Sequence, residues 1–208
     1  EAFESDESPA AYLHLVDRLL ASPRFGERFA VHWLDLARYA DSNGYEKDRD
    51  RTIWPWRDWV IRALNDDMPY DQFVTEQLAG DLMKGKEASV AQIAEWRIAS
   101  GFNRLNQTTS EGGAQEKEYM AKYAADRVRN TSSIFLGVTM GCAECHNHKF
   151  DPFTTKDFYS LAAFFADIKE VGVGNAPAYP VATAEHQEKL KEIDGQLAVL
   201  QKKLQQQT

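Results

Sequence analysis

Cysteine is scarce in this chain: two residues in 208, too few for a disulfide framework. No stretch approaches 18 consecutive apolar residues, which excludes a transmembrane helix. The net charge is −8 and no basic stripe is present, so nucleic acid and anionic membrane surfaces are poor candidate partners. The chain also lacks a Gly-rich phosphate loop and a Gly-x-Ser-x-Gly elbow, so neither of these catalytic signatures is available.

A signal peptide is missing as well, because residues 1–6 have neither a basic nor an apolar region. If the protein is exported, its signal has been removed or the chain is a piece of a longer polypeptide. Apolar residues make up 43% of the sequence, which is typical of a globular protein with a substantial core.

Apolar residues recur mostly at helical spacing, and no alternating pattern predicts a strand. We therefore expect a mainly α fold: one multi-helix domain with a C-terminal helical extension. Gly80 is expected to lower the stability of the helix that contains it, and Thr155 is expected to cap the last helix of the domain. The predicted helices cover about 12–20, 23–40, 70–82, 89–100, 115–135 and 155–165, and one more follows Trp54-Pro55-Trp56 and carries the apolar residues of 59–64.

The C-terminal segment differs in kind from the rest. Its apolar residues step by three, four, three and four, which is a heptad seam: Leu190, Ile193, Leu197, Leu200 and Leu204. Two heptads are short for an independent coiled coil. We expect a domain over 1–168, a loop over 169–182 and an amphipathic helix over 183–208. That helix either packs on its own domain or, as we favour, begins a longer hairpin or coiled coil.

One segment indicates a chemistry: Cys142-Ala143-Glu144-Cys145-His146. Cys-x-x-Cys-His is the spacing at which two thiols attach a c-type haem and the following histidine supplies an axial nitrogen. The motif uses every thiol in the chain. Apolar residues on both sides are candidate walls of a haem pocket or ordinary core: Phe135, Leu136, Val138, Met140, Phe150, Phe153, Phe158 and Phe164.

Two other interpretations of the motif stay open. The first is a structural or redox-active Cys-x-x-Cys in which His146 is incidental. The second is a metal site, in a hydrolase or a binding module, that combines the cysteines with His146, His148 and Asp151. Adjacent Cys145 and His146 rarely turn toward one small ion, whereas haem attachment requires that adjacency.

A larger set of motifs resembles the planctomycete-specific cytochrome-type domain, a family of largely unassigned function. The resemblance spans roughly residues 10 to 168 and is carried by 25–28, 32–41, 43–48, 54–60, 76–82, 111–113 and 141–152. It implies that Cys142 and Cys145 attach haem c and that His146 is the proximal ligand. It also implies a larger exported protein, in the periplasm, in the cell envelope or outside the cell. Asn103 departs from the family pattern, in which a histidine is expected.

The sixth iron ligand would decide between an electron carrier and a haem enzyme with an open distal site. His32 is the first candidate because it lies on an apolar helical stripe, although a buried structural histidine fits the same pattern. Met120 is possible, Met140 is too close to Cys142, and His148 is more suited to Asp151, a propionate or a second metal.

Four arginines are candidate partners of haem propionates, because a guanidinium pairs well with a carboxylate: Arg38, Arg104, Arg127 and Arg129. The leading hypothesis is therefore a c-type haem domain for electron transfer. Its partner would be a redox protein or a neighbouring domain of the same polypeptide.

Overall fold

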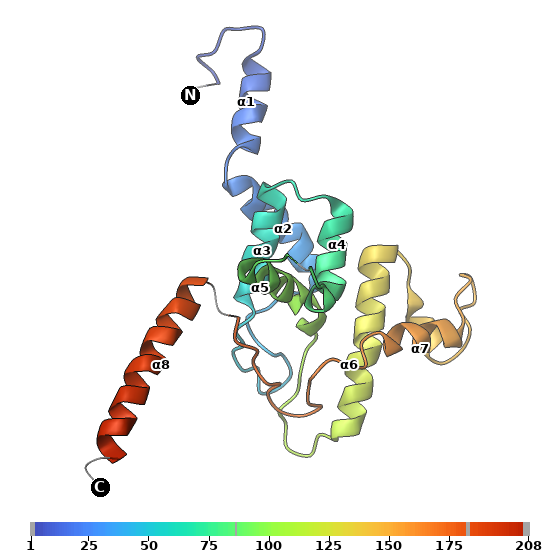
Figure 1. The fold of residues 1–208 in the computed structure, drawn as a ribbon. Helices are drawn as coiled ribbons and strands as arrows, with labels where there is room; N and C mark the ends of the chain where they lie inside the picture. The colour runs from blue at the N-terminus through green and yellow to red at the C-terminus, as the bar shows by residue number, and fades with distance from the viewer. Residues whose placement is uncertain (1–2, 86, 182–183, 206–208) are drawn as a thin grey trace.

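Helices account for most of the protein in a computed structural model that describes residues 3–85, 87–181 and 184–205 (Figure 1). The described residues contain no β-strand, only two isolated bridges, so the predicted mainly α fold is confirmed. The α-helices are α1 (Ala11–Leu20), α2 (Arg24–Ala37), α3 (Trp54–Asn65), α4 (Tyr70–Ala79), α5 (Val90–Ala99), α6 (Glu116–Thr131), α7 (Thr155–Ala163) and α8 (Ala184–Gln205). Within the described ranges, no helix has the length and apolarity that crossing a membrane requires.

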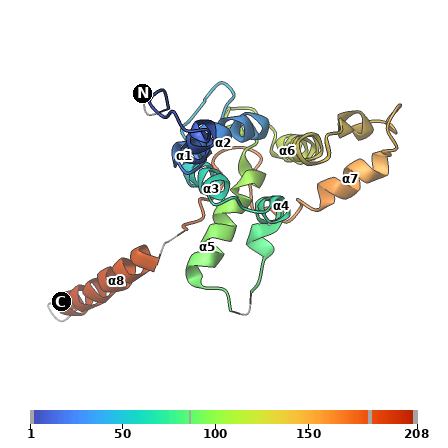
Figure 2. The same ribbon diagram turned by 90° about the horizontal axis from the view of Figure 1, so that it is seen from above.

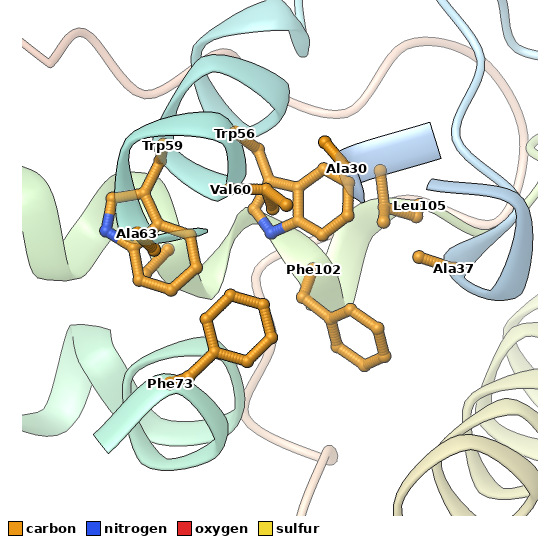
Figure 3. Packing of buried hydrophobic residues seen from close by; sticks show 10 residues of the cluster. Ala30, Ala37, Trp56, Trp59, Val60, Ala63, Phe73, Phe102 and Leu105 are labelled. Atoms are coloured by element: carbon orange, nitrogen blue, oxygen red, sulfur yellow. The ribbon is translucent and has the colours of Figure 1, made fainter. Parts of the chain in front are cut away.

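Helices α2, α3, α4 and α5 enclose the larger core, called here the first core (Figure 3). Aromatic rings dominate it: Phe73 lies 4.9 Å from Trp33 and 5.3 Å from Trp59 between ring centroids. Such pairs add to the free energy gained by burying large apolar side chains. The buried members are Ala30, Ala37, Trp56, Trp59, Val60, Ala63, Phe73, Ala99, Phe102 and Leu105.

A smaller second core lies between α6, α7 and a short 3-10 turn, Met140–Glu144. Both views of the ribbon place α7 on the side of α6 that faces away from α2 and α3 (Figures 1 and 2). The buried members of the second core are Ala125, Val128, Met140, Ala143 and Phe158. The cysteine motif therefore belongs to the second core and not to the aromatic first core.

Two ion pairs and one aromatic side chain join the two cores. Arg127, on α6, forms a buried ion pair with Glu170 and also donates to the carbonyl oxygen of Asn103 at 2.7 Å. Arg38, just after α2, forms a two-point ion pair with Asp126. Phe135, which follows α6, packs its ring against Trp33 and Phe102. These contacts hold α6 against the first core, with α7 and the motif on its far side.

Three local predictions are wrong. The second helix ends at Ala37, because Arg38 adopts a left-handed conformation with φ 59°. Gly80 follows α4 and begins a 3-10 turn, Gly80–Leu82, instead of lying inside the α-helix. It permits close packing there, because a Cβ would lie 2.1 Å from the carbonyl oxygen of Trp96. The cap of α7 is Thr154, not Thr155, because Asp157 stands three residues after Thr154 and completes a capping box.

The first and last helices have mostly exposed apolar faces. No residue of α1 is buried, and the heptad residues of α8, from Leu190 to Leu204, are exposed. α8 extends away from the other helices in both views (Figures 1 and 2). The predicted helix over 183–208 is thus observed for 184–205, while 182, 183 and 206–208 lie outside the described residues. What packs on the seam stays a prediction.

Candidate functional site

Cys142 lies in a 3-10 turn, Met140–Glu144, and Cys145 is the residue that ends this turn; both cysteines are exposed. In this helix type residues three apart are in register along the axis, which aligns Cys142 with Cys145. The carbonyl oxygen of Cys142 accepts from the backbone N–H groups of Cys145 at 3.4 Å and His146 at 3.5 Å. Met140 and Ala143, also three apart, point the other way into the second core. The turn therefore anchors one side of the motif and presents both thiols to solvent.

His146 follows the turn with its ring oriented by a local hydrogen bond. Its Nδ1 lies 2.8 Å from the carbonyl oxygen of Asn147. A carbonyl only accepts, so in the neutral imidazole this contact places the proton on Nδ1 and leaves the lone pair on Nε2. Metal-binding histidines have this arrangement, since the second hydrogen bond fixes the tautomer and raises the basicity of the ligating nitrogen. The His146 side chain is exposed, so Nε2 is accessible to a ligand.

The loop after the motif is held by its own hydrogen bonds. The Asn147 side-chain oxygen accepts from the backbone N–H of Thr155 at 3.0 Å, which ties the motif to the start of α7. His148 donates its backbone N–H to the carbonyl oxygen of Phe153 at 2.8 Å. Tyr159, on α7, donates its hydroxyl to the carbonyl oxygen of Glu144 at 3.2 Å. Helix α7 therefore acts as a brace for the segment that contains His146.

The His148 side chain is mostly buried and forms hydrogen bonds within its own loop. Its Nδ1 accepts from the backbone N–H of Asp151 at 2.8 Å, and its side chain is only 7% exposed. The Asp151 carboxylate lies 3.5 Å from the same nitrogen. Among the described residues, no three His, Cys, Asp or Glu side chains are placed to hold one metal ion. The described geometry thus gives the metal-site interpretation with His146, His148 and Asp151 no supporting cluster.

The apolar residues around the motif separate into two groups. Met140 and Phe158 are buried in the second core, and Phe135 packs in the first. Phe150, four residues after His146, is 85% exposed, and Phe164, at the end of α7, is 83% exposed. Leu136 and Tyr159 are also exposed. Large apolar side chains exposed on one small unit are typical of a binding surface.

The four predicted arginines lie in different environments. Arg127 donates four hydrogen bonds, to Glu170, Asn103 and Asn106, so only one of its five N–H groups is left for a propionate. Arg38 pairs with Asp126, and Arg104 donates to the carbonyl oxygen of Lys169 at 2.6 Å. Only Arg129 contacts the motif: it pairs with Glu144 and covers Gly141. Of the four candidates, the structure therefore brings Arg129, and not Arg38 or Arg127, to the motif.

The candidate sixth ligands are not brought together with the motif in the described part of the chain. His32 is exposed and lines a cleft of about 310 Å³ with Phe25, Phe29 and Leu36, and no residue of 140–146 lines that cleft. Met140 is buried beneath the cysteines. Met120 lies in the second turn of α6, nine residues before Arg129, which corresponds to about 13 Å along the helix.

Asn103, where the family resemblance predicts a histidine, lies in the 3-10 turn Ser100–Arg104, next to Phe102 of the first core. Its amide nitrogen donates to the carbonyl oxygens of Gln77 and Leu78, and its side-chain oxygen is buried without a hydrogen-bond partner. The residue thus contributes to the packing of α4 and is remote from the cysteine turn along the chain.

Asn147 is the residue that sequence reasoning missed. Its carbonyl oxygen orients His146, and its side-chain oxygen accepts from the backbone N–H of Thr155, the first residue of α7. A signal was present: Thr154-x-x-Asp157 predicts a helix start, and an asparagine shortly before a helix start is a common acceptor for its free N–H groups. The hydrogen bond between the Asn147 carbonyl oxygen and His146 could not be predicted, because every residue has a main-chain carbonyl.

The fold and the site together define an all-helical domain that presents a Cys-x-x-Cys-His turn on the surface of its smaller core. The chain belongs to the PSCyt2 family, described as a protein of unknown function (DUF1549), which matches residues 1–170. Neither a curated protein nor a solved structure matches the chain.

Proposed function

We propose that this protein is a c-type haem domain that transfers electrons within a larger exported polypeptide. Cys142 and Cys145 would attach the haem through thioether bonds, and His146 would supply an axial nitrogen through Nε2. The observation that carries the proposal is the motif turn itself: both cysteines are exposed, and the Nδ1–H of His146 is held by the carbonyl oxygen of Asn147.

The surrounding residues fit such a group. Phe150 and Phe164 offer apolar surface that no part of the described protein covers, and a porphyrin needs apolar surface on both faces. Arg129 lies against Gly141 with its charge shared by Glu144, so it is the best placed of the arginines to meet a propionate. A bound haem would supply a one-electron iron couple whose potential depends on its axial ligands and its exposure.

The proposed setting follows from the chemistry of the attached group. Covalent haem attachment belongs with an exported protein, so we place the domain in the periplasm or cell envelope. Its electron partner would be a redox protein or a neighbouring domain of the same polypeptide. The family name PSCyt2 is compatible with a cytochrome-like role.

The test is to produce the chain in cells with a c-type haem maturation system. Wild type is compared with the double variant Cys142→Ala/Cys145→Ala. We expect wild-type protein to keep its haem absorbance after denaturation and the double variant to lose it. Glu27→Ala, at an exposed ion pair on α2 away from the motif, is the control variant and should retain attachment. Haem absorbance that disappears from denatured wild type would overturn the proposal.

A haem enzyme with an open distal site is the second candidate. The observation that favours it concerns the two candidate second ligands of the iron. His32 lines a cleft that contains no residue of the motif, and Met140 is buried in the second core, so neither is placed to bind the iron together with His146. Rapid spectral change on adding carbon monoxide or cyanide to the haem-loaded protein would support this candidate. A spectrum that these ligands leave unchanged would support electron transfer.

A further inference from the structure

A second potential site lies far from the motif, in a cleft of about 630 Å³ between α4 and α5. In Figure 2, α4 and α5 lie below the ends of α2 and α3, whereas the motif lies beyond α6. Six side chains line the part of the cleft that matters here: Gln72, Glu76, Met83, Glu87, Gln92 and Trp96.

Glu76 is the unusual member of this lining, because its residue is only 2% exposed. One of its carboxylate oxygens, Oε1, accepts from Gln72 Nε2 at 2.8 Å and from Trp96 Nε1 at 3.2 Å. Both donors are neutral. The described lining of the cleft contains no lysine, arginine or histidine. The carboxylate is therefore held by hydrogen bonds and has no counter-charge among the described residues that line the cleft.

A buried carboxylate without a cation is costly, since hydrogen bonds from neutral groups do not replace the hydration of a full charge. A cation that enters the cleft would remove that cost. The cleft favours an organic cation over a metal ion for two reasons. Its walls include the Trp96 indole and the Met83 thioether, and no metal-holding cluster of His, Cys, Asp or Glu occurs among the described residues.

We propose that this cleft binds a primary alkylammonium group. The ammonium would donate to the Glu76 carboxylate and to the side-chain oxygen of Gln72, whose nitrogen is already used as a donor to Glu76. The alkyl chain would lie against Trp96 and Met83, and the indole face would add a cation–π attraction. This site is independent of haem attachment, so either proposal can fail without the other.

The probe is n-butylammonium, titrated into the 208-residue chain and followed through the indole N–H signal of Trp96 by NMR. The neutral isostere 1-butanol is the matched control ligand. We expect saturable binding of the ammonium, with a Kd near about 1 mM, and a shift of the Trp96 signal, which is assigned by its loss in Trp96→Phe. No comparable shift is expected from 1-butanol.

The decisive variant is Glu76→Gln, which keeps the shape and the acceptor oxygen but removes the charge. We expect it to weaken n-butylammonium binding by about tenfold or more, as for a lost charge-assisted hydrogen bond. Glu95→Gln, on the same helix as Trp96 but paired with Arg62 at the surface, should bind as wild type does. Circular dichroism and thermal unfolding show that each variant is folded.

Three results would overturn this proposal. One is equal binding of 1-butanol and n-butylammonium, which would make the cleft a general apolar site. The second is unchanged n-butylammonium affinity in folded Glu76→Gln. The third is an unshifted Trp96 signal in wild type across the titration.

Discussion

The first and second cores stabilise their surroundings in different ways. The first core buries large aromatic side chains such as Trp56, Trp59 and Phe73. The second buries mostly smaller side chains and leaves Phe150 and Phe164 exposed. Its motif turn accepts a hydrogen bond from Tyr159 at the carbonyl oxygen of Glu144, and the Asn147 side-chain oxygen that follows the turn accepts from the backbone N–H of Thr155. The comparison indicates that the first core provides stability, while the second presents chemical groups at a surface that a ligand can complete.

Truncating a first-core aromatic should have the largest effect. Phe73→Ala removes a ring that contacts both Trp33 and Trp59, so we expect the free energy of unfolding to fall by about 3–5 kcal/mol. Urea unfolding measures it. Phe150→Ala is the control from the other unit, and a change within about 0.5 kcal/mol is expected because that ring is exposed. Similar losses from both variants would erase the distinction between the cores.

Breaking the ion pair between the cores should come next. Glu170→Ala leaves the Arg127 guanidinium buried without its carboxylate, and we expect a loss of about 3 kcal/mol. Arg24 and Glu27 form an exposed pair on α2, so Glu27→Ala should cost far less than Glu170→Ala, because water screens an exposed pair. Thermal or urea unfolding compares them. Equal small losses would mean that the buried pair does not hold α6 against the first core.

Adding a methyl group at Gly80 should be the third largest effect. The new Cβ would meet the carbonyl oxygen of Trp96 at 2.1 Å, so α4 and α5 would have to separate. We expect Gly80→Ala to cost about 1–3 kcal/mol. Gly112→Ala is the control, because a Cβ there meets nothing within 4 Å. A neutral Gly80→Ala in chemical unfolding would show that this contact is looser than described.

The cap of α7 should give the smallest effect and a pH dependence. Thr154→Ala should cost about 1 kcal/mol. Hydrogen bonds from the backbone and hydroxyl of Thr154 lower the pKa of Asp157 below its ordinary value of 3.8. A lowered folded-state pKa contributes stability above the unfolded value, and this is lost as the pH falls through the folded one. Asp157→Asn should therefore remove part of the acid dependence of unfolding, which urea titrations from pH 7 to below pH 3.8 would reveal. An unaltered pH profile in this variant would contradict the capping role.

The helices could be predicted because apolar spacing reports which face of a helix is buried, and α5, with Ser89 as its cap, follows the prediction closely. The ends were less predictable. Gly80 was expected to lie inside a helix, and only the position of Trp96 across the α4–α5 contact explains why it must be glycine. Thr154 and Thr155 are adjacent, and the spacing to Asp157 decides between them.

The candidate site was predictable in its reactive groups but not in its surroundings. Cys142, Cys145 and His146 follow from their spacing. The different environments of Phe135 and Phe150 could not be predicted from the sequence. Both are aromatic residues near the motif, and only tertiary packing places the first against Trp33 and leaves the second exposed. Arg127 and Arg129 differ for the same reason: one faces Glu170 in the interior, the other faces the motif.

The central claim is that the two exposed thiols carry a haem in the mature protein. The most direct measurement is the intact mass of the denatured protein purified from its native cells. The account predicts a mass higher than that of the polypeptide by one haem, with no thiol left to alkylate. A mass equal to that of the bare polypeptide, with Cys142 and Cys145 both alkylated by iodoacetamide, would contradict it.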